Sequence, residues 1–218
     1  MHMRIAHFVA ETQVDGPGTR TSVYVKGCPI RCRGCQSPQL FEQEGGIIMS
    51  VKDVAAGLIA HDLPVTILGG EPMAQPEALA ELVVRLKWAG RNVMVYSGYT
   101  LEQLREMTQR TPEIRTVLEW ADTLVDGPFI IEDDDPFVQW RGSRNQRPID
   151  LALMRYEGLD IMQDEPLLHN WDEELELTID DYGLVLGPEG LIDLLLLDGD
   201  EAKQARRCGQ TRGITLHV

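Results

Sequence analysis

The chain has 218 residues, of which 43% are hydrophobic, and its formal net charge is −15. That length is sufficient for one substantial α/β core with a small appendage, and an acidic surface repels phosphate backbones, which argues against nucleic acid as the main partner. No run of about 18 apolar residues could span a bilayer, and no N-terminal segment resembles a signal peptide, so we expect a cytoplasmic protein that binds no membrane. Most of the acidity lies in residues 150–218, which carry 5 basic and 16 acidic side chains; this is typical of a solubilising surface or of a docking face for a partner.

The first 26 residues predict two short strands joined by a tight turn. Strand patterns cover residues 4–10 and 21–26. Between them, the segment Asp15-Gly16-Pro17-Gly18-Thr19-Arg20 combines two glycines with a proline that fixes φ. The turn brings an aspartate and an arginine close to the start of the next segment, so it is either a plain tight turn or part of a functional site.

Three of the four cysteines follow directly, within eight positions: Cys28, Cys32 and Cys35. Cysteines this close together are unsuited to a disulfide framework and indicate a metal centre in a reducing compartment. Three thiolates leave such a centre one ligand short. A zinc site would need a fourth protein ligand, and the candidates are distant in sequence. An iron–sulfur cluster with three cysteines would leave one iron open for another molecule. We expect the open cluster and keep zinc as the alternative, completed by His7, His61 or Cys208.

Strands and helices alternate from residue 50 onward. A capping pattern at Ser50 predicts a helix through about Ala60, a second helix begins at Gln75-Pro76, and Thr100 caps the next. Buried strand patterns begin near residues 65, 92 and 122. This is the βαβ rhythm of a parallel sheet.

The carboxyl ends of parallel strands collect the polar turns of this segment. Ligands bind at these ends in barrels and in open wound sheets alike. We therefore expect the cysteine loop to converge with three turns: Gly69-Gly70-Glu71-Pro72, Ser97-Gly98 and Asp126-Gly127.

The pattern changes after about residue 150. Alternating residues over 174–185, around Asp180-Asp181-Tyr182-Gly183, predict a β-hairpin, and the apolar segment 191–197 predicts either a short helix or a strand. We divide the chain into a metal-binding domain, residues 1–150, and an acidic C-terminal extension packed on it, residues 151–218.

The order of these motifs resembles the radical S-adenosylmethionine (radical SAM) superfamily, whose members hold a 4Fe-4S cluster by such a cysteine triplet and carry a similar GGEP turn. The segment Asp15–Arg20 resembles the activating enzymes of glycyl radical enzymes. Three further segments resemble the activating component of anaerobic (class III) ribonucleotide reductase: Tyr96–Thr100, Val125–Gly127 and Trp140–Gln146. The resemblance covers about residues 3–150 and implies an α/β fold with a partial (β/α) radical SAM barrel.

The resemblance also implies a chemistry. S-adenosylmethionine chelates the open iron, the reduced cluster cleaves its S–C5′ bond, and the 5′-deoxyadenosyl radical removes a Cα hydrogen from a glycine of a partner glycyl radical enzyme. The radical is carried by the cofactor, so no side chain is assigned as catalytic. Electrons would come from a donor such as flavodoxin or ferredoxin. The implied cluster ligands are Cys28, Cys32 and Cys35, and the implied contacts to S-adenosylmethionine are Gly34, Gln36, Gly69, Gly70, Glu71, Ser97 and Asp126.

Individual roles follow from the same resemblance. The turn Gly69–Glu71 would meet the methionyl amino end, because glycines let backbone approach a ligand and a carboxylate offsets an ammonium. Many radical SAM proteins carry an aromatic residue just before the third cysteine, where this chain has Gly34. A small residue there is similar to the reductase-activating branch, and adenine would be held by backbone around Gly34 and Gln36. Ser97 is the candidate for the ribose region, and Asp126 for a contact at the rim.

Other functions remain open at this point. The same cofactor chemistry would suit a tailoring enzyme that acts on a small molecule or peptide, and a zinc- or cluster-binding interaction module would need no turnover. The Trp140–Gln146 segment could be surface packing, and Cys208 an incidental free thiol.

Overall fold

The computed structural model describes residues 1–171, 178–179, 184–187 and 190–193. The chain divides into two compact units. The first consists of Met1–Asp135 and Trp140–His169, and the second of 136–139 with the chain after residue 169. In the described part of the chain, no helix has the length and apolar character needed to cross a membrane.

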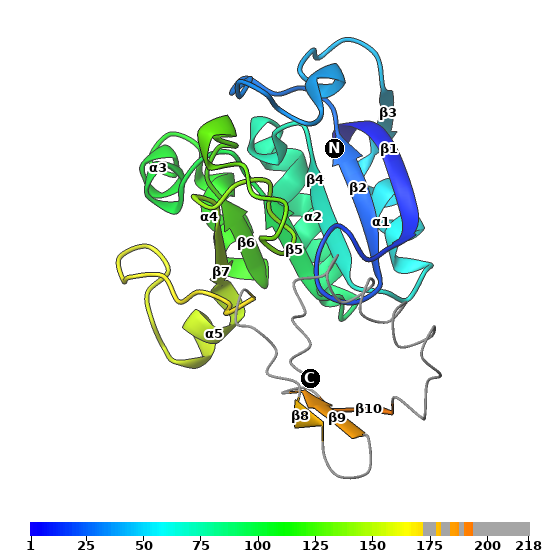
Figure 1. Ribbon diagram of the computed structural model, residues 1–218. Helices are drawn as coiled ribbons and strands as arrows, with labels where there is room; N and C mark the ends of the chain where they lie inside the picture. The colour runs from blue at the N-terminus through cyan, green and yellow to red at the C-terminus, as the bar shows by residue number, and fades with distance from the viewer. Residues whose placement is uncertain (172–177, 180–183, 188–189, 194–218) are drawn as a thin grey trace. The chain divides into compact units, whose positions relative to one another are not determined.

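A mixed seven-stranded sheet forms the centre of the first unit (Figure 1). Its order is β3-β1-β2-β4-β5-β6-β7. Strands β2, β4, β5 and β6 are parallel to one another. Strand β1 pairs antiparallel with β2 and β3, and β7 pairs antiparallel with β6. The strands are β1 (His2–Thr12), β2 (Arg20–Val25), β3 (Ile47–Ser50), β4 (Val65–Gly69), β5 (Val93–Tyr96), β6 (Thr123–Asp126) and β7 (Arg147–Asp150). The predicted parallel strands are confirmed, and the antiparallel edge strands β3 and β7 add to them.

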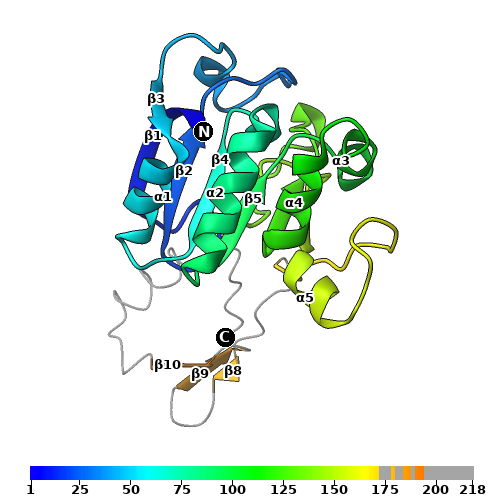
Figure 2. The same cartoon turned by 180° about the vertical axis from the view of Figure 1, so that it is seen from behind.

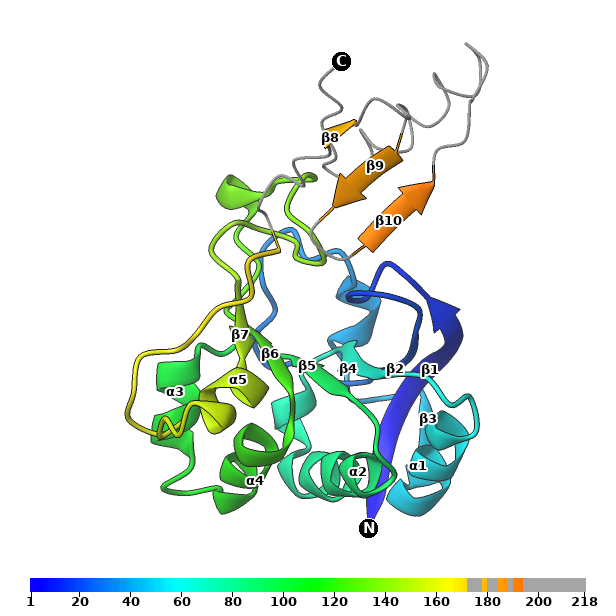
Figure 3. The same cartoon turned by 90° about the horizontal axis from the view of Figure 1, so that it is seen from below.

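Helices cover one face of this sheet. Figures 2 and 3 show α1, α2 and α4 side by side on that face. Val65 and Ile67 of β4 are fully buried and belong to the same apolar core as Leu82 of α2, as expected for a strand inside a layered α/β domain. The helices are α1 (Val51–Ile59), α2 (Pro76–Trp88), α3 (Leu101–Met107), α4 (Pro112–Trp120) and α5 (Leu151–Tyr156), with the single turns η1 (Pro38–Leu40), η2 (Pro72–Ala74) and η3 (Ile131–Asp133).

The predicted helix starts are confirmed by their caps. The Ser50 hydroxyl accepts a hydrogen bond from the Asp53 amide at the start of α1. Thr100 and Gln103 form a reciprocal capping box at the start of α3, which satisfies two amides that the helix itself leaves unpaired. The interval after β5 holds two helices, α3 and α4, where the sequence predicted one.

The opposite face of the sheet is more polar and is covered by the turn between β1 and β2. Arg20 is 3% exposed, and its guanidinium donates to Thr66 Oγ1 at 2.7 Å and to the Val65 carbonyl at 2.9 Å. Thr66 Oγ1 donates in turn to the Asp15 carbonyl at 2.9 Å. The glycine-rich turn is therefore fixed on the sheet, beside the strands whose ends carry the predicted site.

The second unit contains a small antiparallel sheet. Its described strands are β8 (Thr178–Ile179), β9 (Leu184–Gly187) and β10 (Gly190–Asp193), in the order β10-β9-β8. The β8–β9 pairing agrees with the predicted hairpin, and β10 shows that the start of the 191–197 segment is extended. The hairpin turn 180–183, residues 194–197 and Cys208 lie outside the described residues.

Candidate iron–sulfur site

The cysteine loop begins where β2 ends and returns to its own starting point. The Gly27 amide donates to the Leu40 carbonyl and the Cys28 amide to the Phe41 carbonyl, both at 2.9 Å. Gly27 has a φ of +97°, a conformation that residues with a Cβ rarely adopt. These contacts close the loop at its base and keep the three thiols over the carboxyl end of the parallel strands.

The glycine-rich turn after β4 contacts the base of the cysteine loop through its backbone. The Gly70 amide donates to the Val25 carbonyl at 2.8 Å, and the Glu71 amide donates to the Gly27 carbonyl at 2.9 Å. A Cβ at Gly70 would lie 2.4 Å from the Gly27 carbonyl oxygen. Only glycine permits this approach, which joins two predicted parts of the site.

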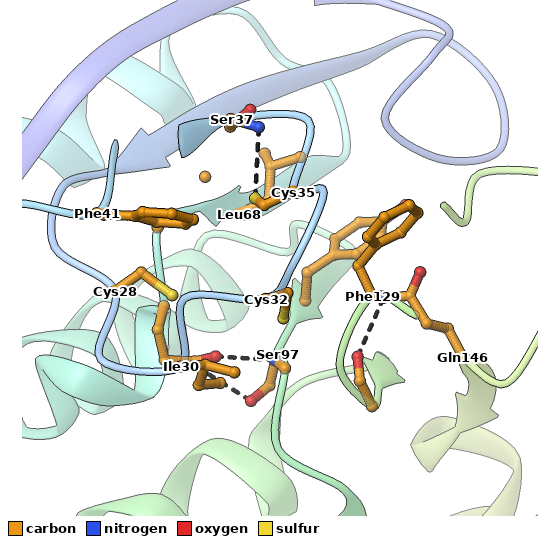
Figure 4. Close-up of a pocket in the computed structure, with 16 residues that line it drawn as sticks. Cys28, Ile30, Cys32, Cys35, Ser37, Phe41, Leu68, Ser97, Phe129 and Gln146 are labelled. Carbon is orange, nitrogen blue, oxygen red and sulfur yellow. Dashed lines mark hydrogen bonds between the residues drawn. The ribbon is translucent and has the colours of Figure 1, made fainter. Parts of the chain in front are cut away.

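A pocket lies where these turns meet (Figure 4). It is open to solvent, and the space within it is about 700 Å³ with the open mouth included. Seven of the ten predicted site residues line it: Cys28, Cys32, Cys35, Gly69, Gly70, Glu71 and Ser97.

The three thiols of the triplet share this pocket. Cys28, Cys32 and Cys35 are free cysteines, and all three line its wall. Three thiolates with open space beside them fit the donor set of a 4Fe-4S cluster that leaves one iron without a protein ligand.

Burial affects the thiols that would hold the cluster. It raises the pKa of the Cys28 and Cys32 thiols, so binding of a metal centre must release their protons. Hydrogen bonds from the backbone oppose the rise at both residues. At Cys35, the Ser37 amide donates to Sγ at 3.4 Å. Backbone amides are therefore directed at the positions where negative charge develops on metal binding.

Glu71 joins the turn after β4 to the turn after β5. It is 1% exposed, and its Oε1 accepts from the Met73 amide at 2.8 Å and from the Ser97 hydroxyl at 3.0 Å. Its Oε2 accepts from the Gly98 amide at 2.8 Å. Burial raises the pKa of Glu71 to about 7, although these three donors act in the opposite direction. The carboxyl group thus holds the pocket wall together.

We expect Glu71→Gln to remove a pH-dependent part of the free energy of unfolding. The folded-state pKa of about 7 exceeds the reference value of 4.5, so the native protein keeps a proton that the unfolded chain releases between these values. The free energy of unfolding therefore falls as pH rises through this window, by about 3 kcal/mol for this one group. Urea unfolding of the metal-free protein at about pH 5 and about pH 7.5 measures the difference.

The matched control for this prediction is Glu106→Gln, at an exposed position of α3. This variant should keep the wild-type dependence of unfolding on pH. An equal pH dependence in wild-type protein and Glu71→Gln would contradict a protonated Glu71 in the folded state.

Ser97 and Asp126 differ in their relation to the pocket. Ser97 lines it, and its hydroxyl, which donates to Glu71, also accepts from the Tyr99 amide at 3.1 Å. Asp126 is fully buried and does not line the pocket. Its oxygens accept from the Leu101 amide at 2.6 Å and from two nitrogens of Arg147 at 3.0 and 2.5 Å. Asp126 therefore anchors the start of α3 behind the pocket wall.

Gly34 and Gln36 lie on the exposed side of the cysteine loop and do not line the pocket. Gly34 has a φ of +77°, and a Cβ there would lie 2.6 Å from Ile131 Cδ1. An aromatic residue, which many radical SAM proteins carry at this position, would have to displace the side chain of Ile131 and adopt a positive φ.

Several pocket residues were not predicted from the sequence. Phe41 and Phe129 come from two loops and carry no local signal, because only the packing of those loops brings them together (Figure 4). Gln146 belongs to a segment that the family resemblance had identified, and that signal could have found it. Gly98 and Gly127 line the pocket as members of the turns that were expected to converge there. The unpredicted lining residues are Ile30, Ser37, Phe41, Leu68, Tyr96, Phe129 and Gln146.

Fold and site together define an α/β protein with three cysteines placed to hold one iron–sulfur cluster. A family model described as a 4Fe-4S single cluster domain matches residues 14–149. The chain is 35% identical over 147 residues to the anaerobic ribonucleoside-triphosphate reductase-activating protein of Vibrio cholerae. This match covers 61% of the present chain and 88% of the Vibrio protein. Proteins of the same name from Haemophilus influenzae and Salmonella typhimurium are 32% and 31% identical, covering 61% and 66% of this chain and 88% and 96% of their own length.

The chain belongs to the family of anaerobic ribonucleoside-triphosphate reductase-activating proteins, which have a single 4Fe-4S cluster. This membership confirms the predicted radical SAM enzyme and its cofactors, a 4Fe-4S cluster and S-adenosylmethionine. No finding supports the interaction module or the tailoring enzyme. About a third of this chain lies outside the match to the Salmonella protein.

Proposed function

We propose that this chain activates an anaerobic ribonucleoside-triphosphate reductase by generating a glycyl radical in it. The observation that carries the proposal is the meeting of Cys28, Cys32 and Cys35 with the Gly69–Glu71 turn in one pocket at the ends of adjacent parallel strands. When bound, the cluster and S-adenosylmethionine supply one electron and a 5′-deoxyadenosyl radical, which takes a Cα hydrogen from a glycine of the partner and leaves 5′-deoxyadenosine and methionine.

In this proposal the protein residues bind and orient the two cofactors. The three cysteines ligate the cluster. Gly69 and Gly70 bring backbone close to the methionyl end, and Glu71, which would lose its proton beside a bound ammonium group, offsets that charge. The Ser97 hydroxyl accepts one hydrogen bond inside the protein and keeps a lone pair for the ribose. The backbone at Gly34 and Gln36 would contact adenine. Asp126 would hold the start of α3 in place behind the wall of the pocket.

Several broader assignments belong to the same proposal. We take the open seven-stranded sheet as the partial barrel of a radical SAM domain in residues 1–150, with residues 151–218 as an extension packed on it. Flavodoxin or ferredoxin would donate the electron, and the protein would work in the cytoplasm, where reduced thiols persist.

The cofactor chemistry is tested by anaerobic reconstitution of the full chain. We expect four irons and four sulfides for each chain, and release of 5′-deoxyadenosine after a reductant and S-adenosylmethionine are added. A protein that binds no iron and sulfide, or releases no 5′-deoxyadenosine, would contradict the proposal and favour an interaction module without turnover.

The protein substrate requires a second measurement. Mixed with an anaerobic reductase under the same conditions, the chain should produce the electron spin resonance doublet of a glycine-centred radical. Release of 5′-deoxyadenosine without a doublet in any such partner would favour a tailoring enzyme instead.

A further inference from the structure

One segment of the structure lies between two predicted motifs and contacts both. It comprises residues 127–134, which follow β6 and include η3, and we call it the bridging loop. We propose that the Trp140–Gln146 motif positions the cluster, because it fixes the bridging loop and the bridging loop in turn holds the cysteine loop. The inference rests on the proposed function, since it takes Cys32 and its neighbours as cluster ligands.

The motif holds the first residues of the bridging loop with two side-chain amides. Asn145 Nδ2 donates to the Pro128 carbonyl at 2.8 Å, and Gln146 Nε2 donates to the Gly127 carbonyl at 3.1 Å. Gln146 Oε1 also accepts from the amide of Gly142 at 2.8 Å. One glutamine therefore both folds its own motif and fixes the neighbouring loop.

The centre of the motif holds the next two residues of the bridging loop. Ser143 is fully buried, and its Oγ accepts from the Ile130 amide at 3.2 Å. A Cβ at Gly142 would lie 2.9 Å from Cδ2 of the Phe129 ring, so the ring rests on the backbone of this glycine. Polar and steric contacts thus fix Phe129 and Ile130 from one side.

The bridging loop meets the cysteine loop at three places. Phe129 and Cys32 line the same pocket, and Figure 4 shows the two residues side by side. Ile131 fills the space above Gly34, at 2.6 Å from where a Cβ would stand. Arg33 and Glu132 form an ion pair of 2.8 Å between exposed side chains, which contributes little by itself. Phe129 and Ile131 are the contacts that depend on an exact loop position.

The surroundings of its ligands affect the redox potential of a cluster. Hydrogen bonds to the sulfurs and exposure to solvent both contribute, and outer contacts orient ligands and tune metal centres in proteins generally. The motif supplies no cluster ligand in this proposal, yet it sets the positions of Phe129 and Ile131 beside the cysteine loop. Ser143 and Gly142 are therefore positioning residues for the cluster.

The test is an anaerobic redox titration of the reconstituted full chain. Ser143→Ala removes the acceptor of the Ile130 amide, and Gly142→Ala pushes the Phe129 ring from its place. We expect both variants to shift the midpoint potential of the cluster away from the wild-type value, because the bridging loop no longer holds its place beside the cysteine loop. Gly57→Ala is the matched control, because a Cβ there meets nothing within 4 Å, and it should keep the wild-type potential.

The outcomes separate this inference from the proposed function. Wild-type potentials in both variants, at full iron content and with wild-type circular dichroism, would overturn the role of the bridging loop and leave the cluster assignment intact. Absence of iron from the wild-type protein would contradict the proposed function itself, and the inference with it.

Discussion

Cys32→Ala is expected to abolish the cluster and the release of 5′-deoxyadenosine. Cys32 lies in the middle of the triplet and lines the pocket. Without its thiolate, two ligands remain for a cluster that needs three from the protein. Loss of an outer contact typically lowers metal affinity by about 10- to 100-fold, and loss of a ligand should exceed that. Iron and sulfide analysis after anaerobic reconstitution measures the first effect, and chromatography of 5′-deoxyadenosine the second.

The fourth cysteine provides the control for this prediction. Cys208 is distant in sequence from the triplet, and Cys208→Ala should keep iron content and turnover. Normal cluster content in Cys32→Ala would contradict the whole assignment of ligands. Loss of the cluster in Cys208→Ala would show instead that the fourth cysteine takes part in the metal centre.

The elements of the central sheet could be predicted because their signals are local. The apolar runs of β4 and β5 and the caps at Ser50 and Thr100 depend on neighbouring residues alone. The strands β3 and β7 were missed, because a four-residue edge strand is defined mainly by its partner and its own sequence carries little periodicity. The sequence also predicted one helix after β5, and only the structure showed that this interval holds both α3 and α4.

The part of the candidate site that lies at strand ends could also be predicted, whereas the part on distant loops could not. Cysteine spacing and strand ends identified the residues at the base of the pocket, since parallel strands bring their ends together whatever the loops do. Phe41 and Phe129 could not be placed, because they reach the pocket through the packing of loops distant in sequence. The absence of an aromatic residue at Gly34 was visible in the sequence. Its physical reason, the side chain of Ile131, was not.

Gly70→Ala is expected to have the largest effect among substitutions that leave every proposed ligand in place. The Cβ would lie 2.4 Å from the Gly27 carbonyl oxygen and 3.0 Å from the carbonyl carbon. These are backbone atoms at the base of the cysteine loop, so no side-chain rotation can relieve the clash. Either the turn or the loop must move, and overpacking of this kind costs about 1–3 kcal/mol.

The same movement should impair the chemistry. The Gly27 carbonyl accepts from the Glu71 amide at 2.9 Å, and the loop carries the cluster ligands, so the substitution separates the turn from the thiols. A misplacement of about 1 Å between reacting groups can lower a rate by about 100-fold. We therefore expect a decrease of that order in 5′-deoxyadenosine formation, together with a lower free energy of unfolding in urea.

A second alanine substitution separates this steric effect from a general effect of replacing glycine. Gly57→Ala lies inside α1 with open space around the new Cβ, and alanine is favoured over glycine in a helix by about 1 kcal/mol. This variant should be at least as stable as the wild-type protein and fully active. If Gly70→Ala matches it in both measurements, the turn after β4 and the cysteine loop do not depend on each other as the structure indicates. If Gly70→Ala alone loses activity while it keeps its iron, the turn acts on S-adenosylmethionine rather than on the cluster.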